Sequence, residues 1–178
     1  MHLTGRLVSL RPISLDDCTA RYVNWLRDPE VNRYLETRWV EQTLESVRAF
    51  VIAVGRDPTS HLMAITDAES DRHIGNIKIG PIRSHHNYAD LSYFIGDRDY
   101  WGRGYATEAI QLAIRLGFER LGLHRLQAGI YATNVGSARA LEKAGFIRDS
   151  ILHRQVLGPS GWEDRVCYRV LEEEWQSS

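Results

Sequence analysis

The sequence has few cysteines, no long apolar run and almost no net charge. Its two cysteines, Cys18 and Cys167, stand far apart and form no pair at metal-ligand spacing. Such usage is typical of a reducing compartment, where thiols stay free. No stretch approaches the ~18 apolar residues of a membrane span, and the first residues lack the apolar core of a secretion signal. We therefore expect a cytoplasmic protein that makes no membrane contact.

The charge balance also argues against a nucleic-acid partner. The chain carries 22 Lys and Arg against 23 Asp and Glu, a formal net charge of -1, and it has no basic tail. A length of 178 residues with 43% hydrophobic and 25% charged residues is typical of one soluble globular domain. We find no internal repeat and no linker, so the prediction is a single domain over residues 1–178.

The apolar periodicity predicts a mixed α/β chain folded around one sheet. Helices are expected to begin near Ser14 and near Thr43, and two more are expected over 106–121 and 137–144. The expected strands cover residues 6–11, 61–66, 73–79, 89–95, 123–131, 146–157 and 162–171.

The most informative segment is Tyr100–Glu108, which lies between a predicted strand and a predicted helix. Two glycines, Gly102 and Gly104, permit a sharp turn and a close approach of the backbone to a ligand. A helix start adds unpaired N–H groups and a partial positive charge, so we expect a phosphate or pyrophosphate here, with Arg103 adding charge. The segment lacks the P-loop pattern, and Thr107 stands where a dinucleotide fingerprint needs its third glycine. A glycine turn without a ligand is the open alternative.

A second pattern runs from Asn134 to Phe146 and contains Asn-x-x-Ser followed by Lys-x-Gly-Phe. Taken alone, Asn134 is typical of a helix-start turn and Ser137 of an N-cap. The two motifs together resemble the GNAT superfamily of N-acetyltransferases, in particular the branch with the ribosomal-protein serine/alanine N-terminal acetyltransferases. The resemblance spans nearly the whole chain. One position departs, because Trp101 stands where the family usually has Gln or Arg.

The resemblance implies a fold, a co-substrate and a binding site. The fold would be a single GNAT-type α+β domain, with a mostly antiparallel mixed sheet of about seven strands, about four helices and a splayed V between the fourth and fifth strands. Acetyl-CoA would be the acetyl donor, and no metal is expected. Relatives often form dimers, so a homodimer is open. The implied cofactor-binding residues are Phe94, Ile95 and Gly96 for the pantetheine arm, Gly102, Arg103, Gly104, Tyr105, Ala106 and Thr107 for the pyrophosphate, and Asn134 and Ser137.

The resemblance also implies catalytic residues. Many GNAT enzymes carry a Tyr general acid at the position of Leu141, so this chain lacks it, and Ser137 is the nearest substitute. Asp149 matches an acidic position of the branch and is the candidate general base. The alternatives are His153 and Glu108, and Glu108 is the poorer candidate because a first-turn Glu more often partners the helix dipole.

Three functions stay open at this point. The first is acetylation of a primary amine on a small molecule, such as an amino sugar, a polyamine or an antibiotic. The second is acetylation of a protein N-terminus. The third is a coenzyme A-binding sensor without turnover, which the absent tyrosine favours. The segment Tyr34–Trp39 could shape the acceptor pocket or simply cover the core. His85 and His86 could border that pocket, and we find no further ligands that would make them a metal site.

Overall fold

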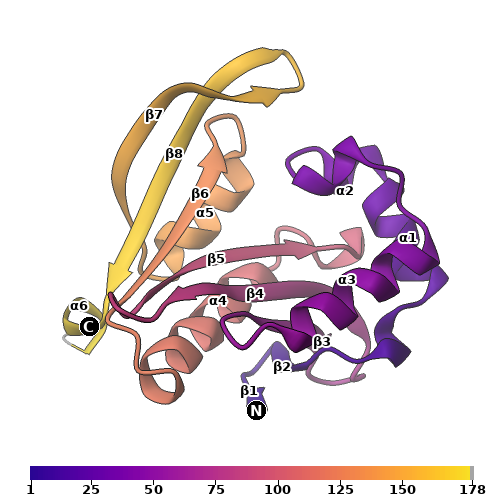
Figure 1. The fold of residues 1–178 in the computed structure, drawn as a ribbon, viewed down its shortest axis with the longest axis horizontal. Coiled ribbons are helices and arrows are strands. Elements are labelled where there is room, and N and C mark those ends of the chain that lie inside the picture. The colour runs from indigo at the N-terminus through magenta and orange to yellow at the C-terminus, as the bar shows by residue number, and fades with distance from the viewer. Residues whose placement is uncertain (177–178) are drawn as a thin grey trace.

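The computed structural model describes residues 1–176, which form one mixed eight-stranded sheet with helices on both faces (Figure 1). The order of strands across the sheet is β1-β2-β3-β4-β5-β6-β8-β7. The strands are β1 Leu3–Thr4, β2 Val8–Pro12, β3 His61–Asp67, β4 His73–Arg83, β5 Tyr88–Ile95, β6 Arg125–Tyr131, β7 Ile147–Gly158 and β8 Gly161–Leu171.

Six α-helices surround this sheet in the described part of the chain, and two of them, α2 and α6, are only about one turn long. The short ones explain why the sequence indicated about four. The helices are α1 Ala20–Arg27, α2 Pro29–Asn32, α3 Leu44–Arg56, α4 Tyr105–Arg115, α5 Val135–Lys143 and α6 Glu172–Gln176. Three 3-10 turns, η1 Leu15–Asp17, η2 Glu36–Trp39 and η3 Arg98–Tyr100, and a π-turn, η4 Leu116–Arg120, complete the set. None of the described helices is long and apolar enough to cross a membrane.

Two apolar clusters place the helices on opposite faces of the sheet. One cluster contains Ile110 and Ile114 of α4, Leu141 of α5 and the β4 residues Ile77 and Ile79. The other cluster unites α1 and α3 with Phe94 of β5, through buried residues that include Tyr22, Trp25, Val47 and Val51. Alternate residues of a strand point to opposite faces, and two strands contribute to both clusters: β3 through Met63 and Leu62, and β5 through Ile95 and Phe94.

The sheet opens between β5 and β6, its one parallel pair of strands in the described residues. The pairing joins Tyr88–Asp90 to Arg125–Gln127 and goes no further, although both strands continue. The predicted V between the fourth and fifth expected strands is therefore confirmed, as is the mostly antiparallel sheet. The opening leaves the second half of β5 without a neighbour on one side.

Several boundaries differ from the prediction for local reasons. The helix expected over 106–121 changes at Leu116 to a π-turn, in which the Leu121 N–H bonds to the Leu116 carbonyl. The helix expected at Ser137 begins at Val135, and its N-cap is Asn134 rather than Ser137. β4 continues past Pro81, because the register shift between Ile79 and Ile82 needs no ladder N–H there.

Candidate functional site

A cavity of about 1410 Å³ passes through the opening between β5 and β6. Its walls come from both faces of the sheet, since it is lined by Tyr105 and Ser137 on the α4–α5 face and by Tyr22 and Val47 on the α1–α3 face. Seven Lys or Arg residues line it against four Asp or Glu, so its walls carry a positive excess. The cavity is large enough for two reactants that meet at the opening.

At one end the glycine turn leads into α4. Gly102 and Gly104 have φ values of +71° and +90°, a region that side chains rarely adopt, and Gly104 is the N-cap of α4. Residues 102–107 all line the cavity. The Trp101 indole donates a hydrogen bond of 2.8 Å to the Ile95 carbonyl, so Trp101 attaches this turn to the end of β5.

Glu108, in the first turn of α4, holds the N-terminal segment. Its carboxylate accepts hydrogen bonds from the backbone N–H groups of Arg6, Leu7 and Val8, at 3.0, 2.5 and 2.8 Å. These contacts across about a hundred residues explain Glu108 better than the helix dipole does. They also occupy the carboxylate, which does not favour a role as general base.

Ser137 lies on the same face, and its partner was missed by sequence reasoning. The Ser137 and Tyr93 hydroxyls are 2.6 Å apart, and both residues line the cavity. Burial raises the pKa of the Tyr93 phenol to about 12, although the bond to Ser137 works against this shift. The phenol is therefore protonated at neutral pH. Asn134 accepts a hydrogen bond from the Ser137 N–H at 3.2 Å, which fixes the first turn of α5.

Of the three residues expected to hold the pantetheine arm, Phe94 and Ile95 line the cavity. Gly96 does not line it: the Gly96 N–H bonds to the Ile74 carbonyl at 2.8 Å, and Trp25 lies 2.2 Å from where a Cβ would stand. The backbone N–H of Gly96 thus points toward β4. Since successive strand residues direct their backbone groups to opposite sides, the N–H of Ile95 faces the opening toward β6.

The structure does not bring Asp149 to the cavity. Asp149 lies on β7 and forms ion pairs with Arg125 at 2.8 Å and Arg169 at 3.7 Å. His153 is exposed and pairs with Asp164 at 3.2 Å, also outside the cavity lining. Leu141, at the position of the usual tyrosine, is fully buried in the core. His85 and His86 are exposed in the loop before β5 and line neither cavity.

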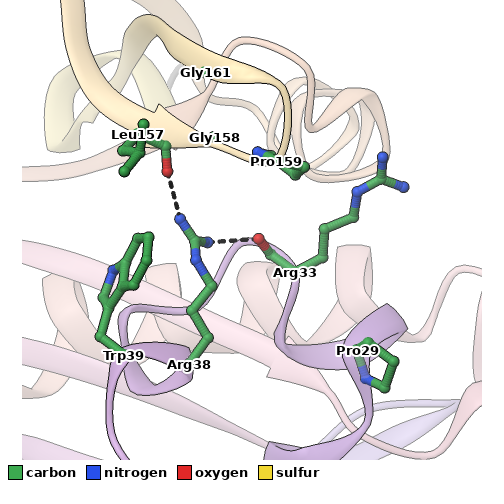
Figure 2. Close-up of a pocket in the computed structure, with 8 residues that line it drawn as sticks. All are labelled: Pro29, Arg33, Arg38, Trp39, Leu157, Gly158, Pro159 and Gly161. Carbon is green, nitrogen blue, oxygen red and sulfur yellow. Dashed lines mark hydrogen bonds between the residues drawn. The ribbon is translucent and has the colours of Figure 1, made fainter.

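On the other face, the segment η2 reaches across the opening. The Tyr131 hydroxyl of β6 donates a hydrogen bond of 2.5 Å to Glu36, and Arg38 donates to Tyr131 at 3.0 Å and to the Leu157 carbonyl at 2.6 Å. Figure 2 shows Arg38 between the carbonyls of Arg33 and Leu157. This contact borders a smaller cavity of about 470 Å³ at the rim, formed with Trp39 and the β7–β8 turn.

A buried chain of polar residues ends at the large cavity. Arg11 pairs with Asp17 at 2.6 Å, Asp17 lies 3.9 Å from the Nδ1 of His73, and the Nε2 of His73 is 2.9 Å from the Oδ1 of Asn76. Within residues 1–176 the Asn76 Nδ2 has no hydrogen-bond partner, although Asn76 is only 3% exposed and lines the cavity beside Tyr22. A buried donor without a partner calls for an explanation, and a bound ligand is one.

We find no candidate metal site in the described residues, which contain no group of three or more His, Cys, Asp or Glu arranged to hold an ion. The structure instead presents a glycine turn at the start of α4, an open strand edge and a hydroxyl pair around one cavity.

Comparison with known proteins identifies the family. The model of the acetyltransferase (GNAT) domain matches residues 7–147. The probable N-acetyltransferase YjcK of Bacillus subtilis is 29% identical over 176 residues, which cover 95% of this chain and 96% of YjcK.

Two solved structures share the fold. A spermidine N-acetyltransferase from Vibrio cholerae, in complex with CoA and spermine, has a TM-score of 0.84 at 18% identity and covers 96% of this chain and 98% of its own. A Vibrio cholerae structure assigned to a ribosomal-protein-serine acetyltransferase has a TM-score of 0.76 at 22% identity, with coverages of 96% and 97%. The family match over residues 7–147 confirms the resemblance carried by the two motifs: the chain belongs to the GNAT acetyltransferase family and is an N-acetyltransferase.

Proposed function

We propose that the chain transfers the acetyl group of acetyl-CoA to a primary amine on a small molecule. The observation that carries this proposal is one cavity that passes through the sheet, with the glycine turn before α4 at one end and a pocket covered by η2 at the other. GNAT acetyltransferases use acetyl-CoA, which supplies an acetyl group activated as a thioester.

The half of the cavity on the α4–α5 face, called the donor half, has walls whose chemistry suits coenzyme A. The backbone N–H groups at the start of α4 and the Arg103 side chain would hold the pyrophosphate. The left-handed Gly102 has no other atom within 4 Å of where a Cβ would stand, so ligand oxygens can approach the backbone closely. Asn134 and Ser137 line the same half, and Phe94 and Ile95 border the path of the pantetheine arm toward the opening.

Ser137 and Tyr93 would complete the reaction. As the C–N bond forms and the C–S bond breaks, the Ser137 hydroxyl can donate to the departing sulfur, and the protonated Tyr93 phenol supports it. The Ile95 N–H can donate to the developing oxyanion, which such a group stabilises by roughly 3 kcal/mol. Asp149 lies outside the cavity, so the amine proton would pass through water toward Glu36 or Asp90, which line it.

The half of the cavity on the α1–α3 face, called the acceptor half, is covered by η2, and this cover supports a small acceptor. The contacts of Glu36 with Tyr131 and of Arg38 with Leu157 join η2 to β6 and β7, and the Tyr34 hydroxyl donates to the Thr133 carbonyl at 3.2 Å. These cross-links restrict passage of a polypeptide and suit a compact amine.

A protein N-terminus is the second candidate. The observation that favours it is the open depression at the rim, lined by Pro29, Trp39 and Pro159, where an extended chain could rest (Figure 2). A peptide amine would then reach the opening from this side.

Calorimetric titration with acetyl-CoA tests the donor, with NADH and ATP as controls. We expect micromolar binding of acetyl-CoA alone. Thiol release is then followed with glucosamine, spermidine, β-alanine and a peptide that begins with Ser-Ala. Turnover of a small amine supports the proposal, and turnover of the peptide alone supports the second candidate. Binding without any turnover would indicate the sensor, whereas no binding would refute the donor site.

A further inference from the structure

Arg165 is a cation of the acceptor half that the proposed chemistry does not use. It lies on β8 as the Cα partner of Tyr131 on β6, so it shares a face with Tyr131 and Gly129. All three residues line the large cavity. The Arg165 guanidinium occupies the space over Gly129, where a Cβ would lie 2.1 Å from its Nε and 2.4 Å from its Nη2. Because Gly129 has no side chain, the Arg165 guanidinium can lie directly against the backbone at this position.

The Arg165 guanidinium has no anionic partner among the described residues. Within residues 1–176 it forms no hydrogen bond and no ion pair, although its side chain is only partly exposed. Two arginines nearby behave differently, because Arg125 and Arg169 each contact Asp149. A partly buried guanidinium without an anion forgoes the strong charge-assisted hydrogen bonds that its five donors can make.

Three carboxylates on this side of the sheet accept hydrogen bonds from neutral donors. Glu36 accepts from Tyr131, Asp90 accepts from Gln127 at 3.0 Å, and Glu163 accepts from the Thr133 hydroxyl at 2.8 Å. Arg165 therefore remains available to a ligand in the cavity. A guanidinium binds a planar carboxylate through two parallel hydrogen bonds, a geometry that an ammonium does not offer.

We propose that Arg165 recognises a carboxylate on the acceptor, so that the substrate is a small amine that also carries a carboxylate, as an amino acid does. This inference rests on the proposed function, since it concerns the acceptor half of the same cavity. It narrows the acceptor class: a polyamine, which has only cationic groups, would be repelled by Arg165.

Matched pairs of amines test the proposal by thiol release. Each pair exchanges the carboxylate for an amide, glycine with glycinamide and β-alanine with β-alaninamide. The kcat/KM values are calculated per neutral amine, because the amide lowers the pKa of the amine. O-phosphoethanolamine and spermidine add a phosphate and a polycation. We expect kcat/KM to favour the carboxylate member by about tenfold or more. An equal or reversed preference, or a preference for the phosphate, overturns the proposal.

Variants then locate the preference. Arg165→Gln should abolish it, and Gly129→Ala should weaken it strongly while it keeps every charge, because the new Cβ displaces the guanidinium. Arg33→Gln is the matched control, since it removes a cation from the same cavity at its rim and should retain the preference. If Arg33→Gln abolishes the preference equally, the effect is one of general charge and the proposal fails.

Two measurements separate this proposal from the proposed function. Calorimetric titration of the wild type with acetyl-CoA tests the donor site, and Arg165→Gln should bind acetyl-CoA with unchanged affinity. A loss of that affinity would assign Arg165 to the donor and overturn the inference. If no amine is turned over, N-acetylglycine should still raise the unfolding temperature of the CoA complex, and N-acetylglycinamide should not. Absence of that difference also overturns it.

Discussion

The Ser137 hydroxyl and the Tyr93 phenol act as one hydrogen-bonded unit, and each has a conservative variant that removes only the hydroxyl. We expect Ser137→Ala to lower kcat by about tenfold to a hundredfold, with little change in the affinity for acetyl-CoA. Tyr93→Phe should lower kcat less, because the phenol acts through the serine. Steady-state kinetics with the acceptor from the thiol-release screen measures both. Unchanged turnover in Ser137→Ala would remove this residue from the proposed chemistry.

Gly104 offers the most direct test of the anion site. Its φ of +90° strains any side chain, and an aspartate would place a negative charge at the start of α4. Gly104→Asp should therefore abolish measurable binding of acetyl-CoA in calorimetry. Gly122→Asp is a control with a similar backbone, φ +65°, on the loop before β6. If the two variants bind acetyl-CoA equally well, the turn is structural.

Sequence patterns pointed to cavity-lining residues where the motif is local. Gly102, Gly104 and Ser137 belong to short patterns, and each lines the cavity. Tyr93 and Arg165 belong to no such pattern, because strand pairing alone brings them to the cavity. The alternation of β5 and the pairing of β8 with β6 could have indicated their faces. The position after Gly-Phe suggested Asp149, but it points to Arg125 and Arg169 instead.

The start of α4 and the strand β2 depend on each other through Glu108. Its carboxylate accepts three backbone N–H groups of residues 6–8, and these donors lose their partner if the side chain is shortened. We expect Glu108→Ala to lower the free energy of unfolding by about 2 kcal/mol, measured in urea. Glu119→Ala removes an exposed pair with Arg115 and should cost less than about 0.5 kcal/mol. Equal costs would contradict the structural role of Glu108.

Helices and strands were predicted best where a capping residue or a turn bounds a periodic run of apolar residues. Thr43 caps α3 as the pattern indicated, with a 3.0 Å bond from the Ser46 N–H. β1 was missed, because a strand of two residues is too short to show the alternation of apolar and polar side chains. The end of α4 was placed too late, since a π-turn keeps the apolar spacing of a helix through Phe118. Periodicity reports which face is buried, and it does not report the hydrogen-bond pattern.

Acid should destabilise the whole molecule through the buried chain from Arg11 to Asn76. Burial lowers the pKa of His73 below its ordinary 6.5, against the opposing effects of Asn76 and Asp17. Burial raises the pKa of Asp17, but its bonds with Arg11 and Ser14 outweigh this, and the net pKa is lowered from 3.8. Between the folded and the unfolded pKa of each group, the unfolded chain binds more protons than the folded chain. Stability is therefore lost as the pH falls through the range of His73 and then through that of Asp17.

Urea unfolding at about pH 7.5 and about pH 5.5 measures the first of these losses. The groups that face His73 are Asp17 and the rings of Tyr22 and Trp25, with Arg11 behind Asp17. We expect His73→Gln to have a smaller difference in unfolding free energy between the two pH values than the wild type. A difference of the same size would show that another group carries the pH dependence.

The short ladder between β5 and β6 has a consequence for motion. Three residue pairs join the two strands, so the sheet consists of two plates that meet at a narrow seam. The amides of Tyr93 and Ile95 face the opening and should exchange hydrogen quickly in the free protein, and a ligand that bonds to them would supply the missing hydrogen bonds. Acetyl-CoA should therefore slow exchange at Tyr93 and Ile95 and leave Ile65, deep in β3, unchanged. The ligand would in this sense finish the folding of the sheet.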